Sequence, residues 1–258
     1  MYLLSDIGNT RAKLAIFEEK NCKPLYYKAI EHSNALDLVS ALNEIKNNHT
    51  DIKQVFYSSV SLKVNDLFEG SVEDCFNIKP YRVTHNDIEL KGNSYEPKDS
   101  VGIDRILSTY ASICLENTNN EEKYASVVID MGTATTVSIM ISDFTFLGGM
   151  IIAGTKTSYQ ALSNVTSLPY YEIGPIESIP NPINNNVKDA IMSGAIYNTI
   201  GTVNYAVSET KKYIKSKYNI KCKIFLTGGI SNLKLLKCKV YPFLVLQGIY
   251  FNMIAKNK

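Results

Sequence analysis

"LLSDIGNTRAKLAIF" at residues 3–17 and "VVIDMGTATTVSIMI" at residues 127–141 are two copies of one pattern. Each copy is an apolar run that ends in a carboxylate, passes through a glycine-containing turn and enters a second apolar run, which predicts a strand-turn-strand unit. The copies align without a gap, and the matched pairs at the turn are Asp6 and Asp130, Gly8 and Gly132, and Asn9 and Thr133. An internal repeat of this length predicts two domains of common design.

The turn that follows each carboxylate has two interpretations. In the first, Gly8-Asn9 is ordinary hairpin chemistry, because both residues tolerate positive φ. In the second, the turn N–H groups donate to phosphate oxygens and the neighbouring carboxylate holds a hard cation. The repeat favours the second interpretation, since the same carboxylate and glycine open both halves. Two domains packed face to face would place both turns in one cleft, where a nucleotide triphosphate and its metal would fit.

The rest of the chain alternates between strand and helix patterns. Strands are predicted over 2–6, 11–17, 24–30, 54–60 and 79–84, and helices over 34–48, 62–75 and 103–114. The polar segment 116–124 is the predicted linker between a domain of residues 1–118 and one of residues 119–258. The predicted fold class is α/β, with two similar domains related by the repeat.

Composition narrows the function classes. The chain has 258 residues, of which 45% are hydrophobic and 20% charged, and this is ordinary for a globular protein with a sizeable core. A formal net charge of +2 gives no reason to expect nucleic acid or an anionic membrane as partner. Five scattered cysteines without a C-x-x-C pair indicate buried thiols in a reducing compartment. Three isolated histidines argue against zinc. With no signal-peptide pattern and no apolar run of membrane-spanning length, the prediction is a cytoplasmic protein.

Two further glycine motifs are candidates for phosphate or nucleotide sites. "GMIIAGTKT" (149–157) is close to a P-loop, but Thr155 stands where the lysine must be, so this interpretation is rejected. "TGG" (227–229) follows an apolar strand and precedes a predicted helix. It is either a structural turn or an adenosine contact.

"YEPKDSVGIDRILSTY" (95–110) contains a candidate base. Apolar positions 103, 106, 107 and 110 form one helix face, which places Asp104 and Arg105 away from the core. Asp104 is then either a helix-start carboxylate favoured by the macrodipole, or a base for a substrate hydroxyl with Arg105 as a clamp for an anionic group. These residues alone leave both interpretations open.

Taken in order, five motifs resemble those of type III pantothenate kinases, members of the superfamily of acetate and sugar kinases, heat-shock ATPases and actin. The motifs are "DIGNT" (6–10), "YEPKDSVGIDR" (95–105), "DMGTATT" (130–136), "GGMIIAG" (148–154) and "TGG" (227–229). The resemblance covers nearly the whole chain, and its most specific element is G-x-D-R with a tyrosine seven residues before the glycine.

The resemblance implies two actin-like (ribonuclease H-like) domains with the active-site cleft between them. It implies ATP-dependent phosphorylation of pantothenate, the first step of coenzyme A biosynthesis, by a cytoplasmic homodimer whose substrate site lies near the subunit interface. Mg²⁺ with ATP and a monovalent cation, K⁺ or NH₄⁺, are the implied cofactors. The alternatives are another small-molecule kinase of the superfamily and a non-enzymatic regulatory relative.

The resemblance also implies roles for individual residues. The ATP site would comprise Asp6, Ile7, Gly8, Asn9, Thr10, Arg11, Ala12, Lys13 and Thr133. Asp6 would lie near Mg²⁺, Asp130 would bind the monovalent cation, and Asp104 would be the catalytic base. The pantothenate site would comprise Tyr95, Gly102, Ile103, Asp104, Arg105 and Val187.

Position 187 departs from the family, which carries threonine in N-T-x-x-A at this point. Val187 lacks the hydroxyl that would contact pantothenate, a loss of about 1 kcal/mol. Asn186 or a shifted backbone would compensate.

Overall fold

The computed structural model describes residues 1–31, 35–116, 122–171, 178–229 and 238–255. It divides into two compact units, Met1–Asn117 with Phe243–Lys258 and Thr118–Pro242. The sequence-based division assigns residues 243–258 to the second domain, whereas this segment groups with the first unit. The reason is packing, because the largely buried helix α6 (Leu244–Met253) lies against α3 (Ile103–Glu116) and the first sheet.

The first unit is built on a five-stranded sheet with the order β3-β2-β1-β4-β5. Its strands are β1 (Tyr2–Ile7), β2 (Arg11–Glu18), β3 (Asn21–Glu31), β4 (Gln54–Ser59) and β5 (Tyr81–Arg82). β1, β2 and β3 are antiparallel neighbours, and β4 runs parallel to β1. The remaining short elements of this unit are η1 (His85–Asp87), β6 (Gly92–Asn93) and η2 (Lys98–Ser100). The strand predicted over 79–84 is only two residues long.

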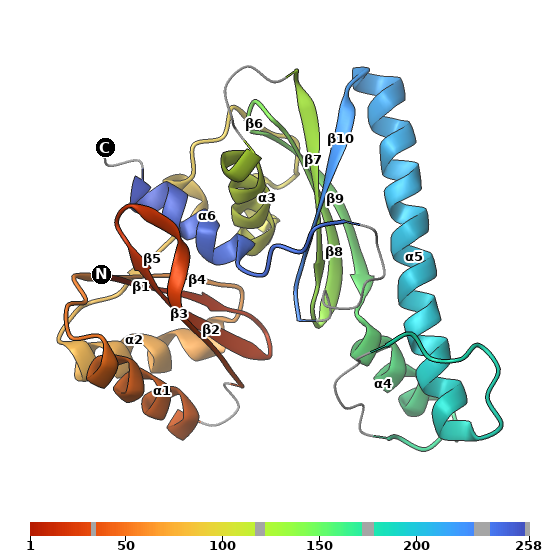
Figure 1. Ribbon diagram of the computed structural model, residues 1–258, viewed down its shortest axis with the longest axis horizontal. Coiled ribbons are helices and arrows are strands. Elements are labelled where there is room, and N and C mark those ends of the chain that lie inside the picture. Colours follow the sequence, from red (N-terminus) through yellow and green to blue (C-terminus); the bar gives the residue numbers. More distant parts are fainter. Residues whose placement is uncertain (32–34, 117–121, 172–177, 230–237, 256–258) are drawn as a thin grey trace. The chain divides into compact units, whose positions relative to one another are not determined.

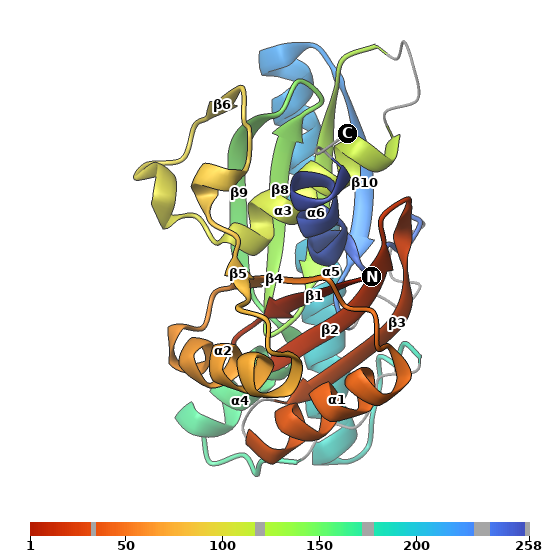
Figure 2. The ribbon, with the colours of Figure 1, turned by 90° about the vertical axis from the view of Figure 1, so that its left-hand side faces the viewer.

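Helices cover both faces of the first sheet (Figure 2). α1 (Ala35–Asn48) and α2 (Leu62–Phe76) bury their apolar stripes against one face. Alternate residues of β1, Leu3 and Ile7, enter this core, so Asp6 lies on the opposite face, where α3 and α6 pack. Gly248 lets α6 approach α3 closely, because a Cβ at this position would lie under 3.0 Å from the Leu107 backbone.

The second unit repeats this design. Its strands and helices are β7 (Tyr124–Met131), β8 (Ala134–Ile141), β9 (Thr145–Ala153), α4 (Thr155–Val165), α5 (Val187–Tyr218) and β10 (Lys221–Thr227). The strand order β10-β7-β8-β9 matches β4-β1-β2-β3, with the same parallel and antiparallel neighbours. The predicted α/β class and the internal repeat are therefore confirmed.

The long helix α5 packs on one face of the second sheet (Figure 1). Its Val203 and Val207 belong to the same core cluster as Val127 and Ile129 of β7. Because side chains alternate along a strand, Asp130 lies on the opposite face, as Asp6 does in the first unit. The two carboxylates thus occupy equivalent places in their own sheets.

The gapless alignment of the two copies is wrong beyond the turn. Gly8 N–H donates to the carbonyl of Arg11, whereas Gly132 N–H donates to the carbonyl of Ala134, so the second turn is one residue shorter. The register shifts accordingly. Asp6 lies opposite Lys13, and Asp130 lies opposite Thr136 rather than opposite the aligned valine.

The cysteines are less buried than predicted. All five are free and partly exposed. Burial nevertheless raises the pKa of the thiols of Cys75, Cys222 and Cys238. Among the described residues, no helix is both long and apolar enough to cross a membrane. Part of the predicted linker and the helix expected after residue 229 lie outside the described residues.

Gly149→Ala tests the pairing of β9 with β8. Gly149 has a φ of +146°, and a Cβ at this position would overlap the carbonyl oxygen of Val137. We expect the substitution to lower the free energy of unfolding by about 1–3 kcal/mol, because the backbone must leave a conformation that only glycine adopts easily. Urea denaturation followed by circular dichroism measures this change.

Gly70→Ala is the matched control. Gly70 lies inside α2, and apart from its chain neighbours and the backbone of its own helix no atom of the described residues lies within 4 Å of the place its Cβ would take. Higher helix propensity should raise the free energy of unfolding by about 0.5–1 kcal/mol. Equal effects of the two substitutions would contradict the assigned backbone constraint.

Candidate active site

Asp6 stands at the end of β1 with its carboxylate almost fully buried. The side chain of Asp6 is 6% exposed, and Lys13 Nζ lies 2.9 Å from its Oδ2 atom. The Ser58 hydroxyl, on the parallel strand β4, donates to Oδ1 at 3.4 Å. Burial also raises the pKa of Tyr27, whose ring lies near Lys13 and Asp6. A buried carboxylate, a cation and a hydroxyl therefore meet at one end of the first sheet.

The predicted phosphate-binding turn follows directly. Ile7 and Ala12 are buried in the sheet, which leaves the turn residues Asn9 and Thr10 exposed. Gly8 and Asn9 do not adopt positive φ, so the conformational freedom that the hairpin interpretation invokes is not used. Arg11 forms a 3.4 Å ion pair with Glu31 on β3, and both side chains are more than half exposed.

The start of α3 lies at the same end of the first unit. Val60, which follows β4, donates its N–H to the carbonyl of Ile7 at 3.1 Å. A Cβ at Gly102 would lie 3.8 Å from Val60 Cγ1. The segment that begins α3 is thereby placed beside the ends of β1 and β4, close to the turn that follows Asp6.

The Asp104 carboxylate folds back over Gly102. A Cβ at Gly102 would overlap Asp104 Oδ1, so glycine leaves the carboxylate its place. Oδ1 also accepts a hydrogen bond from the N–H of Arg105 at 2.9 Å. This is the helix-start contact that one interpretation of the sequence predicts, and the carboxylate remains half-buried rather than fully enclosed.

Arg105 differs from the sequence-based prediction. It is buried, with 4% of its surface exposed, although helical spacing places it away from the core. The helix buries more than its apolar stripe, because both α6 and the segment around Tyr95 pack on it. The guanidinium lies over the Tyr95 ring, 5.6 Å from its centroid, and Nη1 lies 3.4 Å from the Tyr95 hydroxyl. The two residues thus form one partly buried cationic group beside Asp104.

In the second unit, Asp130 and the "TGG" motif lie together. Gly228 has a φ of +98°, and a Cβ there would lie 2.6 Å from both Asp130 Oδ1 and the carbonyl oxygen of Met131. This glycine therefore brings the end of β10 against the carboxylate. Gly228 therefore has a structural role beside Asp130, while the helix expected after the motif lies outside the described residues and an adenosine contact stays a prediction.

The turn after Asp130 is held by the start of α4. The carbonyl of Thr133 accepts the N–H of Gly154 at 3.2 Å and the Thr157 hydroxyl at 2.6 Å. Sequence analysis missed Thr157, because the "GTKT" segment was considered only as a P-loop and rejected as one. It also missed Ser58, which no local motif identifies.

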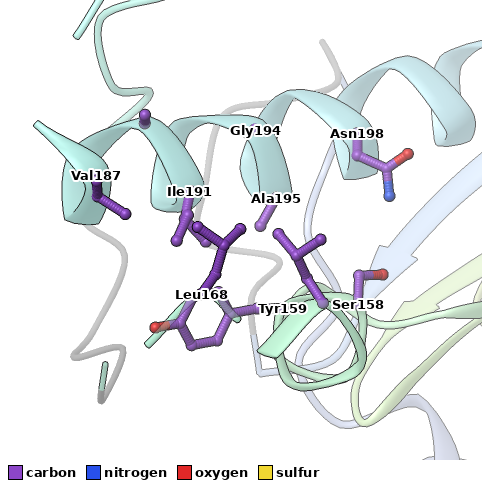
Figure 3. A pocket seen from close by; sticks show the side chains of 10 residues that line it. Ser158, Tyr159, Leu168, Val187, Ile191, Gly194, Ala195 and Asn198 are labelled. Atoms are coloured by element: carbon purple, nitrogen blue, oxygen red, sulfur yellow. The ribbon is translucent and has the colours of Figure 1, made fainter. Parts of the chain in front are cut away.

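Val187 is the first residue of α5 and lines a largely apolar cavity of about 520 Å³ between α4 and α5. Figure 3 shows Val187, Ile191 and Ala195 of α5 facing Tyr159 of α4. The Asn186 side chain caps α5 by accepting the N–H of Asp189 at 2.9 Å, and compensation for the missing hydroxyl by Asn186 or by a shifted backbone stays a prediction.

Two α/β units of one strand order, each opening with a carboxylate and a glycine turn, form the framework of the actin-like nucleotide-dependent kinases. A protein-family model described as type III pantothenate kinase matches residues 2–209. The chain belongs to the type III pantothenate kinase family, as its motifs indicate.

Several solved structures are similar to this chain. They include a putative N-acetylglucosamine kinase from Porphyromonas gingivalis, at 9% identity with 100% of both chains covered and a TM-score of 0.44. An inorganic polyphosphate/ATP-glucomannokinase from Arthrobacter sp. strain KM has 13% identity, 100% coverage of both chains and a TM-score of 0.46. The ethanolamine utilization protein EutJ from Carboxydothermus hydrogenoformans has 11% identity, with 97% of this chain and 89% of that chain covered, and a TM-score of 0.48. At these TM-scores the neighbours add nothing to the family match.

Lys13→Met tests the ion pair at the end of β1. The substitution leaves the buried Asp6 carboxylate without its nearest cation, so we expect the free energy of unfolding to fall by about 1–3 kcal/mol. Arg11→Met is the control on the same strand, and it should change stability by less than about 1 kcal/mol because its pair with Glu31 is exposed. Urea denaturation measures the free energy of unfolding of both variants. Equal losses would contradict the prediction that the burial of Asp6 makes its ion pair with Lys13 the stronger of the two.

Proposed function

We propose that this protein transfers the γ-phosphoryl group of ATP to pantothenate, which gives 4'-phosphopantothenate in the first step of coenzyme A biosynthesis. Family membership motivates the proposal. The observation that carries it is the meeting, at one end of the first unit, of the Asp6–Lys13 pair with the segment that holds Asp104 and Arg105.

The first turn, from Asp6 to Lys13, would hold the ATP phosphates. Its exposed residues can approach phosphate closely, and Lys13 supplies positive charge beside them. Thr133 in the second unit would make a further ATP contact. Positioning and charge neutralisation are most of what phosphoryl transfer requires of a protein.

Mg²⁺ fits the groups around Asp6. A carboxylate and the Ser58 hydroxyl are hard oxygen ligands of the type that Mg²⁺ prefers, directly or through water. Lys13 contacts Oδ2 and leaves Oδ1 toward Ser58. When bound, the metal would neutralise charge on the phosphates. The ion pair between Lys13 and Asp6 would keep the Asp6 carboxylate in place beside it.

The pantothenate site would be formed by Tyr95, Gly102, Ile103, Asp104 and Arg105. Asp104 would take the proton of the pantothenate hydroxyl as that oxygen bonds to the γ-phosphorus and the bond to the leaving ADP oxygen breaks. Arg105 would bind the carboxylate of pantothenate, since a guanidinium braced by a tyrosine ring is a preorganised anion ligand. The overlap at Gly102 explains why the residue two positions before the base is glycine.

Asp130 would hold K⁺ or NH₄⁺. Asp130 Oδ1 and the Met131 carbonyl oxygen each lie 2.6 Å from the place that a Cβ on Gly228 would take, and carboxylate and carbonyl oxygens are suitable ligands for such a cation. In this proposal the equivalent carboxylates of the two halves bind different cations, with Mg²⁺ near Asp6 and K⁺ or NH₄⁺ at Asp130. Lys13 lies opposite Asp6 and Thr136 lies opposite Asp130, so the two carboxylates have different neighbours.

The protein is also proposed to act as a homodimer with the substrate site near the interface. Apolar side chains are exposed along α4, α5 and the segment between them, and they include Val165, Ile183, Val187 and Tyr205. Val187 in this apolar surface would give pantothenate a van der Waals contact in place of the usual hydroxyl.

A coupled assay for ADP release tests the proposal directly. The full chain is supplied with Mg²⁺, ATP and pantothenate, with K⁺ or with choline at equal ionic strength. Pantothenate-dependent and K⁺-dependent ADP formation supports the proposal. ATP turnover that ignores pantothenate but responds to another hydroxylated acceptor indicates a different kinase of the superfamily, and nucleotide binding without turnover indicates a regulatory relative.

Asp104→Asn should lower kcat by about 10²- to 10⁴-fold, because it keeps the shape of the side chain and removes the proton acceptor. ATP affinity should stay near the wild-type value, since the turns hold the nucleotide. Steady-state kinetics at saturating pantothenate and K⁺ measure the change. Asp99→Asn, an exposed carboxylate just before α3, is the control and should retain wild-type kcat. A wild-type kcat for Asp104→Asn would leave this carboxylate only its helix-start role.

Asp130→Ala should abolish activation by K⁺, whereas Asp6→Ala should raise the Mg²⁺-ATP concentration needed for half-maximal rate. The reason is that each carboxylate is assigned to a different cation. Rates measured across K⁺ and Mg²⁺ titrations separate the two effects. The same loss of cation dependence in both variants would show that the division of labour is wrong.

A further inference from the structure

The carbonyl oxygen of Thr133 receives two hydrogen bonds from the first turn of α4. The Thr157 hydroxyl donates at 2.6 Å, and the Gly154 N–H donates at 3.2 Å. A carbonyl oxygen has two lone pairs, so both donors bind at once. The shorter of the two bonds comes from Thr157, a side chain to which neither the motifs nor the proposed function gives a role.

α4 can approach the turn this closely because residue 154 is glycine. A Cβ at Gly154 would overlap the carbonyl oxygens of both Gly132 and Thr133. The backbone of the turn after Asp130 therefore rests on the start of the helix. Thr133 is exposed, so the face of the turn away from α4 is open to a ligand.

α4 is itself fixed against α5. Thr155 is 2% exposed, and its hydroxyl lies 2.8 Å from that of Thr199, which is also buried. Tyr159, 1% exposed, packs in the same cluster as Ile191 of α5. The donors on Gly154 and Thr157 are thus carried by a packed helix and not by a loop.

We propose that Thr157 is a positioning residue for ATP, which acts by holding the Thr133 carbonyl against α4 so that the turn keeps its phosphate-binding shape. The inference rests on the proposed function, because it assigns Thr157 to the same nucleotide site. Loss of the hydroxyl removes the shorter of the two hydrogen bonds that α4 donates to this carbonyl. ATP binding must then order the turn, and the free-energy cost of this ordering lowers the ATP affinity. The chemistry at Asp104 is unchanged.

Thr157→Val and Thr157→Ser separate the hydroxyl from the shape of the side chain. We expect Thr157→Val to raise the Kd of Mg·ATP, measured by calorimetry on the full chain, by roughly two- to tenfold. The KM for pantothenate and the Tm should remain at wild-type values, and Thr157→Ser should restore the affinity. Thr166→Val is the matched control, because it removes a hydroxyl that donates to Leu162 at the other end of α4. Equal ATP affinities for Thr157→Val and Thr166→Val would overturn the proposal.

Amide hydrogen exchange without nucleotide gives an independent readout. Gly132 N–H is bonded across the turn to Ala134, and its exchange should become faster in Thr157→Val and stay unchanged in Thr166→Val. Unchanged exchange in Thr157→Val would also overturn the proposal. If the wild-type protein binds no ATP, the proposed function fails, and the exchange experiment alone decides whether Thr157 holds the turn.

Discussion

Strict alternation of side chains along β1 and β7 determines on which face of each sheet the carboxylates of Asp6 and Asp130 lie. Leu3 and Ile7 must enter the core under α1 and α2, so Asp6 is forced onto the other face of its sheet. Val127 and Ile129 impose the same placement on Asp130. A shift of one residue would exchange core and site, and the apolar runs on either side prevent it.

Close approach of other atoms to the backbone is the second constraint, and near the predicted site residues it is met by Gly102, Gly154 and Gly228. Gly102 leaves room for the Asp104 carboxylate, Gly154 lets α4 rest on the turn after Asp130, and Gly228 brings β10 against Asp130. At each place a Cβ would meet an atom of a residue that the family resemblance assigns to the site or of its immediate neighbour. Gly154 and Gly228 thus bring together segments that are distant in sequence, whereas Gly102 makes room for a side chain two residues further on.

The two halves share a framework but differ in charge. The shorter second turn shifts the register by one residue, so that Thr136 lies opposite Asp130 where Lys13 lies opposite Asp6. Asp6 therefore forms an ion pair with Lys13, whereas Asp130 lies near the carbonyl oxygen of Met131. The two carboxylates thus occupy equivalent places in their sheets but have different neighbours.

The sequence by itself determined the α/β class, the repeat and the family, because these depend on local periodicity and on motifs that are contiguous in the chain. It also identified Asp104 and Arg105, but it placed Arg105 in solvent, since helical spacing cannot foresee that α6 returns from the end of the chain to cover α3. The one-residue register shift was invisible for a similar reason, because it depends on which backbone groups pair across the turn. Ser58 and Thr157 were decided only by tertiary structure, as each acts through a hydrogen bond to a residue distant in the sequence.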